Sequence, residues 1–216
     1  MLYGIFGAGG FGREAMWLAQ QTCLAQHGTA DAFELCFIEH EPKQHIVNGY
    51  RVLSLARFAA TENRERRFNV AIADPIVRQR IVAECEDLGL RPFTIRSPLA
   101  EVHPTAIVGE GAVLCQFTLV SANARVGRHF HLNHHGYVSH DCVIGHFVTF
   151  APAVRCNGAV EIGDLASIGC GAVIHQTTPT RSMRIGASAI VGMGTVVLRA
   201  VPDGATVAGN PAKLLA

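Results

Sequence analysis

The chain has 216 residues, which is enough for one or two domains. It carries 18 Lys and Arg against 17 Asp and Glu, a formal net charge of +1, and no long run of like charges. This balance argues against a nucleic-acid partner. The first residues show neither a signal peptide nor a transit peptide, and no stretch approaches the roughly 18 uninterrupted apolar residues of a membrane span. We therefore expect a soluble, cytoplasmic protein.

The residues 1–100 alternate strand and helix patterns. Strands are predicted at 2–6, 33–39, about 50–53 and 68–72, and helices at about 12–26 and 75–88. Strands that alternate with helices are typical of a parallel sheet covered by helices. We therefore predict a Rossmann-like α/β domain over residues 1–100.

The pattern changes after His103, where every sixth residue is apolar. The twelve positions are Val108, Leu114, Val120, Val126, Leu132, Val138, Ile144, Phe150, Cys156, Ile162, Ile168 and Ile174. The position that follows each of them is nearly always small or turn-forming, which we interpret as the corner of a coil. A β-sandwich would need this spacing to be a coincidence, whereas a hexapeptide β-helix requires it. Residues 101–216 are therefore predicted to form a left-handed parallel β-helix, with residues 176–183 as a projecting loop.

The seven cysteines are an odd number and include no C-x-x-C pair. They are interpreted as reduced, mostly buried small hydrophobic residues. The 22 glycines, with only 7% aromatic residues, indicate a fold with many close turns.

A glycine loop follows the first predicted strand and opens the first predicted helix. Its sequence Gly7-Ala8-Gly9-Gly10-Phe11-Gly12 fits the G-x-G-x-x-G pattern, and Glu39 ends the second strand, where an acidic residue would meet a ribose hydroxyl. Three readings remain open: a nucleotide-sugar site, a site for another phosphate ligand, and a purely structural tight turn.

Six histidines crowd into residues 129–146, which raises the question of a metal site. Adjacent residues of a flat strand face opposite ways, so His134 and His135 cannot both reach one ion, and we predict no metal site. His140 stands out because it takes an outward position, and the equivalent position one coil later is Gly158, which lacks a side chain. A histidine in such a position suits proton removal from an amine or hydroxyl. Its neighbour Asp141 would fix the imidazole tautomer, although sequence neighbours are expected to face different ways.

The hexads, the segment Asn133 to Gly145 (NHHGYVSHDCVIG) and the segment Ala208 to Lys213 (AGNPAK) resemble the bacterial sugar O- and N-acyltransferases of the NeuD and PglD family. The resemblance covers essentially the whole chain. It implies a homotrimer in which acetyl-CoA lies between neighbouring β-helices and the N-terminal domain holds the nucleotide part of the sugar substrate.

The same resemblance assigns roles to individual residues. It implies that His140 is the catalytic base, with Asp141 and Asn133 beside it in the catalytic site. It places Gly158, Cys170, Ala208 and Lys213 at the acetyl-CoA site, and Gly9, Gly10, Phe11, Gly12 and Glu39 at the substrate site. Three positions depart from the family pattern and leave the acceptor open: Phe11 and Thr149 stand where relatives carry histidine, and Glu39-His40 replaces a common pair of aspartates.

The expected function is acetyl-CoA-dependent acetylation of a nucleotide-linked amino sugar for bacterial surface glycan biosynthesis, with His140 as general base. One alternative acceptor is sialic acid or another sugar hydroxyl. A covalent route through Cys142 or Cys170 is a further possibility. The non-enzymatic alternative is a trimeric scaffold whose glycine loop senses a nucleotide.

Overall fold

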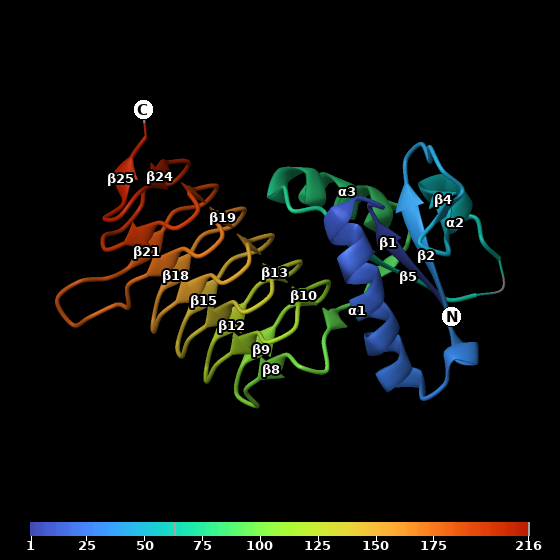
Figure 1. Cartoon of the computed structure of the whole chain (residues 1–216), viewed down its shortest axis with the longest axis horizontal. Coiled ribbons are helices and arrows are strands. Elements are labelled where there is room, and N and C mark those ends of the chain that lie inside the picture. Colours follow the sequence, from blue (N-terminus) through green and yellow to red (C-terminus); the bar gives the residue numbers. More distant parts are fainter. Residues whose placement is uncertain (63, 216) are drawn as a thin grey trace. The chain divides into compact units, whose positions relative to one another are not determined.

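The computed structural model describes residues 1–62 and 64–215. The chain divides into two compact units, Met1–Pro98 and Leu99–Ala216. The first is a helix-covered sheet and the second is a stack of short parallel strands (Figure 1). The predicted fold class, a Rossmann-like domain followed by a parallel β-helix, is confirmed.

The first unit has a sheet whose central strand is β1. Its elements are β1 (Leu2–Phe6), α1 (Gly10–His27), the 3-10 helix η1 (Ala30–Ala32), β2 (Glu34–Glu39), β3 (Ile46–Val47), β4 (Tyr50–Ser54), α2 (Leu55–Ala59), β5 (Arg66–Val70), α3 (Pro75–Asp87), β6 (Arg91–Pro92) and β7 (Ile95–Arg96). The strand order is β3-β4-β2-β1-β5-β6, with only β3 antiparallel to its neighbour. The chain order reverses at β1, and ligands of such sheets bind outside the carboxyl ends of the strands at that point.

Local signals explain the helix boundaries. Asp74 accepts hydrogen bonds from the backbone N–H groups of Ile76 and Val77, and Pro75 fills the first turn of α3. Gly28 ends α1 in the left-handed conformation, with φ of 77°. Strand β5 begins two residues earlier than predicted because its register pairs Arg66 with Leu2 of β1.

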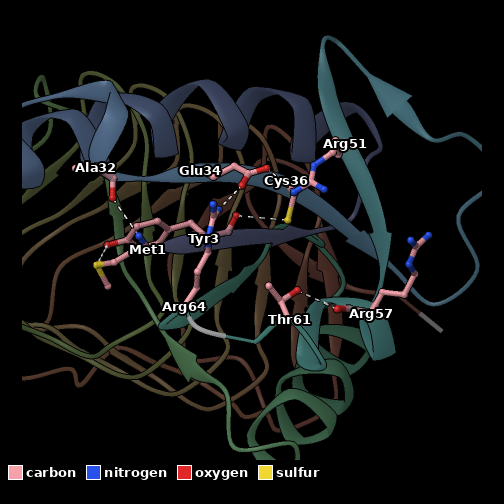
Figure 2. A network of polar contacts seen from close by, with 9 residues as sticks. All are labelled: Met1, Tyr3, Ala32, Glu34, Cys36, Arg51, Arg57, Thr61 and Arg64. Atoms are coloured by element: carbon pink, nitrogen blue, oxygen red, sulfur yellow. Dashed lines mark hydrogen bonds and ion pairs between the residues drawn. The ribbon is translucent and has the colours of Figure 1, made fainter.

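An ion-pair network lies at the amino end of β2. The carboxylate of Glu34 pairs with the guanidinium groups of Arg51 on β4 and Arg64 before β5, as Figure 2 shows. Burial opposes ionisation of this carboxyl, but the two arginines outweigh it and hold the pKa of Glu34 below its usual range. Because these residues lie at the amino ends of the strands, we assign the network to stability and not to a ligand site.

The β-helix is made of two- and three-residue strands in three sheets. The first sheet contains β8 (Glu101–Val102), β11 (Leu119–Val120), β14 (Tyr137–Val138), β17 (Arg155–Cys156), β20 (Val173–Ile174) and β23 (Val196–Val197). The second contains β9 (Ile107–Val108), β12 (Arg125–Val126), β15 (Val143–Ile144), β18 (Glu161–Ile162) and β21 (Arg184–Ile185). The third contains β10 (Val113–Leu114), β13 (His131–Leu132), β16 (Thr149–Phe150), β19 (Ser167–Ile168), β22 (Ile190–Val191), β24 (Thr206–Ala208) and the antiparallel β25 (Lys213–Leu214).

The predicted period is confirmed by the strand register. Tyr137 pairs with Leu119 of the preceding coil and with Arg155 of the following one. Of the twelve inward apolar positions, the eleven from Leu114 to Ile174 are buried and Val108 in the first coil is half-buried. Burial of these side chains in one continuous column is the main source of stability in the coil.

The small residues at the corners serve a different purpose from the one predicted. The left-handed residue of each corner lies three positions after the inward aliphatic one and is often not glycine, as at Asn123 and Asp141. The small residue that directly follows the inward one instead lies against the backbone of the next coil. A Cβ on Gly127 would lie 2.6 Å from the carbonyl oxygen of Gly145. Glycine is therefore required there by the close approach of two coils and not by the turn itself.

The predicted loop at residues 176–183 interrupts the coil as expected. It separates β20 from β21, and a bridge between Thr178 and Arg181 closes it into a short hairpin. Its last residue, however, does not project. Met183 is fully buried in the core of the β-helix, so the loop is shorter than predicted.

Candidate active site

His140 and Asp141 form the turn between β14 and β15. The turns that lead from the first sheet to the second, at residues 103–106, 121–124, 139–142 and 157–160, stack through backbone hydrogen bonds, and we call them the His140 corner. His140 Nδ1 lies 2.8 Å from Asp141 Oδ2. Both side chains are more than half exposed, at 58% and 53%. The pair is therefore accessible to a substrate.

The contact corrects the expectation that Asp141 faces away from His140. That expectation treated the two residues as strand neighbours, whose side chains alternate. Asp141 is instead the left-handed residue of the turn, with φ of 58°, and this conformation brings its carboxylate to the imidazole. A carboxylate at Nδ1 leaves Nε2 as the proton-accepting atom of the neutral ring.

Gly158 lies beside His140 one coil later, as predicted. A Cβ on Gly158 would lie 2.5 Å from both Cε1 and Nε2 of His140. The imidazole can therefore pack against the corner only because Gly158 has no side chain. On the other side of His140, the preceding coil has only Ala122 at the same position. The Nε2 edge is thus flanked by small residues.

A groove of about 380 Å³ adjoins Asp141 on the side of the preceding coils. It is lined by Thr105, Ile107, Asn123, Arg125, Asp141 and Val143. Asn123 donates a hydrogen bond from Nδ2 to Asp141 Oδ1 at 3.1 Å. The hydrogen bonds from His140 and then Asn123 stabilise the ionised form of Asp141 and lower its pKa. Sequence reasoning missed Asn123, although its spacing of 18 residues from Asp141 was a usable signal.

The other residues predicted for the acyltransferase site lie elsewhere in the β-helix. Asn133 follows β13 at a different corner, where its Oδ1 accepts hydrogen bonds from the backbone N–H and Nδ1 of His134. Cys170 is exposed in the turn after β19. Ala208 pairs with Lys213 near the C-terminus. Within one described chain, then, only His140, Asp141 and Gly158 come together.

Cys142 does not support a covalent route. Its side chain is fully buried in the core, with Sγ 3.9 Å from Cys156 Sγ and 3.1 Å from the carbonyl oxygen of Asn157. An acyl donor at the surface cannot reach this thiol. The histidines of residues 129–146 are also dispersed: His129 stacks on Phe147, and His146 accepts a hydrogen bond from the backbone N–H of Arg128. Among the residues that the structure describes, no group of three metal-ligating side chains occurs.

The glycine loop of the first unit lies at the carboxyl end of β1. Gly12 must be glycine, because a Cβ there would lie 1.8 Å from the carbonyl oxygen of Gly7. A Cβ on Gly9 or Gly10 would meet nothing within 4 Å. Glu39 accepts a hydrogen bond from the backbone N–H of Ala8 at 3.4 Å, and a cavity of about 280 Å³ borders the loop. Its lining includes Ala8, Gly9, Arg13, Glu39, Lys43 and Gln44, so two cations and one carboxylate surround an open stretch of backbone.

The β-helix and its exposed histidine-aspartate pair are typical of a hexapeptide-repeat acyltransferase, and a Rossmann-like domain precedes them in this chain. Comparison with known proteins agrees. The chain is 45% identical over 212 residues to GDP-perosamine N-acetyltransferase of Escherichia coli O157:H7, covering 98% of this chain and 95% of the relative. The model of the PglD N-terminal domain matches residues 4–85. The chain therefore belongs to the family of sugar N-acetyltransferases that includes GDP-perosamine N-acetyltransferase.

Solved structures resemble the chain over its whole length. WeeI from Acinetobacter baumannii AYE has a TM-score of 0.92 at 41% identity and covers 100% of both chains. The acetyltransferase domain of PglB from Neisseria gonorrhoeae, in complex with acetyl coenzyme A, has a TM-score of 0.87 at 30% identity over 99% of this chain and 98% of that one. A histidine-to-asparagine variant of perosamine N-acetyltransferase from Caulobacter crescentus, with CoA and GDP-perosamine, has a TM-score of 0.84 at 27% identity over 99% and 96%.

The predicted class, an acetyl-CoA-dependent sugar acyltransferase, is confirmed at the level of the family. The sequence left N- and O-acetylation open, and the family is one of N-acetyltransferases. None of the helices in the described part of the chain is long and apolar enough to cross a membrane.

Proposed function

We propose that the chain transfers the acetyl group of acetyl-CoA to the amino group of a GDP-linked amino sugar such as GDP-perosamine, within bacterial surface glycan biosynthesis. The observation that carries the proposal is the exposed His140 and Asp141 pair beside Gly158, on the β-helix of a chain 45% identical to GDP-perosamine N-acetyltransferase. The proposal assigns acetyl transfer to residues 101–216 and binding of the nucleotide part of the sugar to residues 1–100.

The mechanism that this geometry supports is direct transfer. The amine nitrogen attacks the thioester carbonyl while His140 Nε2 takes one of its protons. The carbon–sulfur bond then breaks, the amide forms, and the proton leaves with the CoA thiol. Asp141 holds the Nδ1 proton and stabilises the imidazolium that forms in between. The backbone N–H of Gly158 donates to no other group in the described residues, and we assign to it the polarisation of the thioester oxygen.

Acetyl-CoA would occupy the length of the β-helix between His140 and the C-terminal turn. Coils repeat at about 4.8 Å, so the nearly four coils from β14 to β24 span roughly 18 Å. A cavity of about 430 Å³ at that end is lined by Arg199, Pro211, Ala212 and neighbouring apolar residues. We assign Cys170, Ala208 and Lys213 to this path and Asn133 to the catalytic site, as the family resemblance implies.

The substrate is tested by measuring CoA release with a panel of acceptors. A GDP-linked amino sugar should give a kcat/KM at least about tenfold higher than a UDP-linked amino sugar. Free sialic acid and a GDP-linked sugar with a hydroxyl in place of the amine should release no CoA above background. Equal or faster release with the hydroxyl sugar would show an O-acetyltransferase, and no turnover with any acceptor would favour the nucleotide-sensing scaffold.

We further propose that the active enzyme is a homotrimer. The groove beside Asp141 is lined in part by the exposed apolar side chains Ile107 and Val143, which are 57% and 48% accessible. A second chain would cover them and complete the acetyl-CoA site. Light scattering should give three times the 23.1 kDa of one chain. A fully active monomer at assay concentration would contradict the proposal.

A further inference from the structure

Three polar residues form a column along the His140 corner. Thr105, Asn123 and Asp141 occupy the same turn position in three successive coils, 18 residues apart. Thr105 Oγ1 accepts a hydrogen bond from the backbone N–H of Asn123 at 3.0 Å. The next residue of the column, Ala159, has no polar side chain. The polar column therefore ends at the histidine-aspartate pair.

The two oxygens of Asp141 are divided between two partners. Oδ2 contacts His140 Nδ1 at 2.8 Å, and Oδ1 accepts the amide N–H of Asn123 at 3.1 Å. An exposed carboxylate with one partner can rotate about its last torsion, which has a broad energy profile. A second donor on the other oxygen fixes the plane of the carboxylate. That plane in turn sets the direction in which the imidazole is held.

Asparagine suits this position for two reasons. Its φ is 61°, and asparagine enters the left-handed region more readily than most residues. Its side chain ends in an amide that donates to a carboxylate without adding a charge. An aspartate of the same shape could not donate when ionised, and a lysine would compete with the imidazole for Asp141. The backbone N–H of Asn123 donates to Thr105 Oγ1, and this hydrogen bond fixes the backbone from which the side-chain amide of Asn123 extends.

We infer that Asn123 is a positioning residue for acetyl transfer, which acts by fixing Asp141 and, through it, His140. The inference rests on the proposed role of His140 as the base. It assigns to Asn123 no contact with either substrate, although the side chain also borders the groove of about 380 Å³. Positioning predicts a change in kcat, whereas substrate contact predicts a change in KM.

The first test is Asn123→Gly, which keeps the left-handed turn and removes the amide. We expect kcat to fall about fivefold to tenfold, in line with the loss of one hydrogen bond to a charged group, with KM for both substrates within about twofold of the native values. The matched control is Ser188→Gly, which makes the same kind of change at an exposed left-handed turn residue of another corner, with φ of 55°, and should leave kcat within about twofold. A rise in either KM with kcat unchanged would overturn the inference.

The second test is a double-mutant cycle with Asp141→Gly. If Asn123 acts only through the carboxylate, Asn123→Gly should cause no further loss of kcat in the Asp141→Gly enzyme. Multiplying losses would show that Asn123 acts independently of Asp141 and would overturn the inference. Thermal unfolding of each variant separates these results from loss of folded protein. The cycle is separate from the base assignment, because His140→Ala tests the proposed mechanism whatever the cycle gives.

Discussion

Replacing His140 by alanine should lower kcat by about 10²-fold or more while the β-helix stays folded. The His140 side chain is 58% exposed, and a carboxylate holds its Nδ1, which leaves Nε2 as the atom that can accept a proton. Its removal leaves binding of both substrates and polarisation of the thioester in place, but it removes the proton acceptor. Steady-state CoA release, with both KM values determined, measures the effect.

The matched control for His140→Ala is His146→Ala. His146 is also an exposed histidine of a β-helix turn, but its Nδ1 accepts a backbone N–H and contacts no carboxylate. This variant should keep kcat within about threefold. A His140→Ala enzyme that is folded, assembled and still active at the native rate would contradict the role of His140 as base.

Gly158→Ala provides a second variant, which keeps the histidine but displaces its ring. The new Cβ would lie 2.5 Å from two ring atoms, so the imidazole must leave the position in which it is observed. We expect kcat to fall, but by a smaller factor than in His140→Ala. A native kcat would show that the ring position seen here is not the one used in the reaction.

The β-helix could be predicted because one apolar residue recurs at every sixth position of the sequence. Each hexad buries one apolar side chain at a fixed position, so the residues from Leu114 to Ile174 that form the core can be found without any knowledge of long-range contacts. The reason for the corner glycines could not be predicted, because it depends on a contact between coils. Gly127 must be glycine because the backbone of Gly145 in the next coil approaches it closely. Met183 was likewise missed, since an apolar residue at the end of a loop carries no periodic signal.

The candidate site was predicted in part for a related reason. His140 and Gly158 share a position in the repeat, so the sequence alone places them side by side. The contact between His140 and Asp141 depends on the left-handed backbone at Asp141, which strand alternation does not describe. Asn133 and Cys170 lie at another corner of the coil, so one chain does not show how they would join His140. A site shared between chains would bring such corners together.

Replacing Gly10 by valine should raise KM for the sugar nucleotide by about tenfold or more and leave KM for acetyl-CoA nearly unchanged. A Cβ on Gly10 meets no protein atom within 4 Å, so the side chain projects into open space at the amino end of α1. That end of a helix favours a phosphate, and a side chain there would block close approach of the substrate diphosphate to the backbone. Losing even one hydrogen bond to a charged group costs about tenfold in affinity.

The contrast with Gly12 separates loss of binding from loss of folding. A Cβ on Gly12 would lie 1.8 Å from the carbonyl oxygen of Gly7. Gly12→Ala should therefore push the start of α1 away from the end of β1 and lower the yield and melting temperature of the protein. Gly10→Val should melt close to the native enzyme, because its side chain has room. If acetyl-CoA KM rises instead, or if neither KM changes in the stable Gly10 variant, residues 1–100 do not bind the nucleotide through this loop. The open backbone at Gly9 and Gly10 would then serve only the tight turn between β1 and α1.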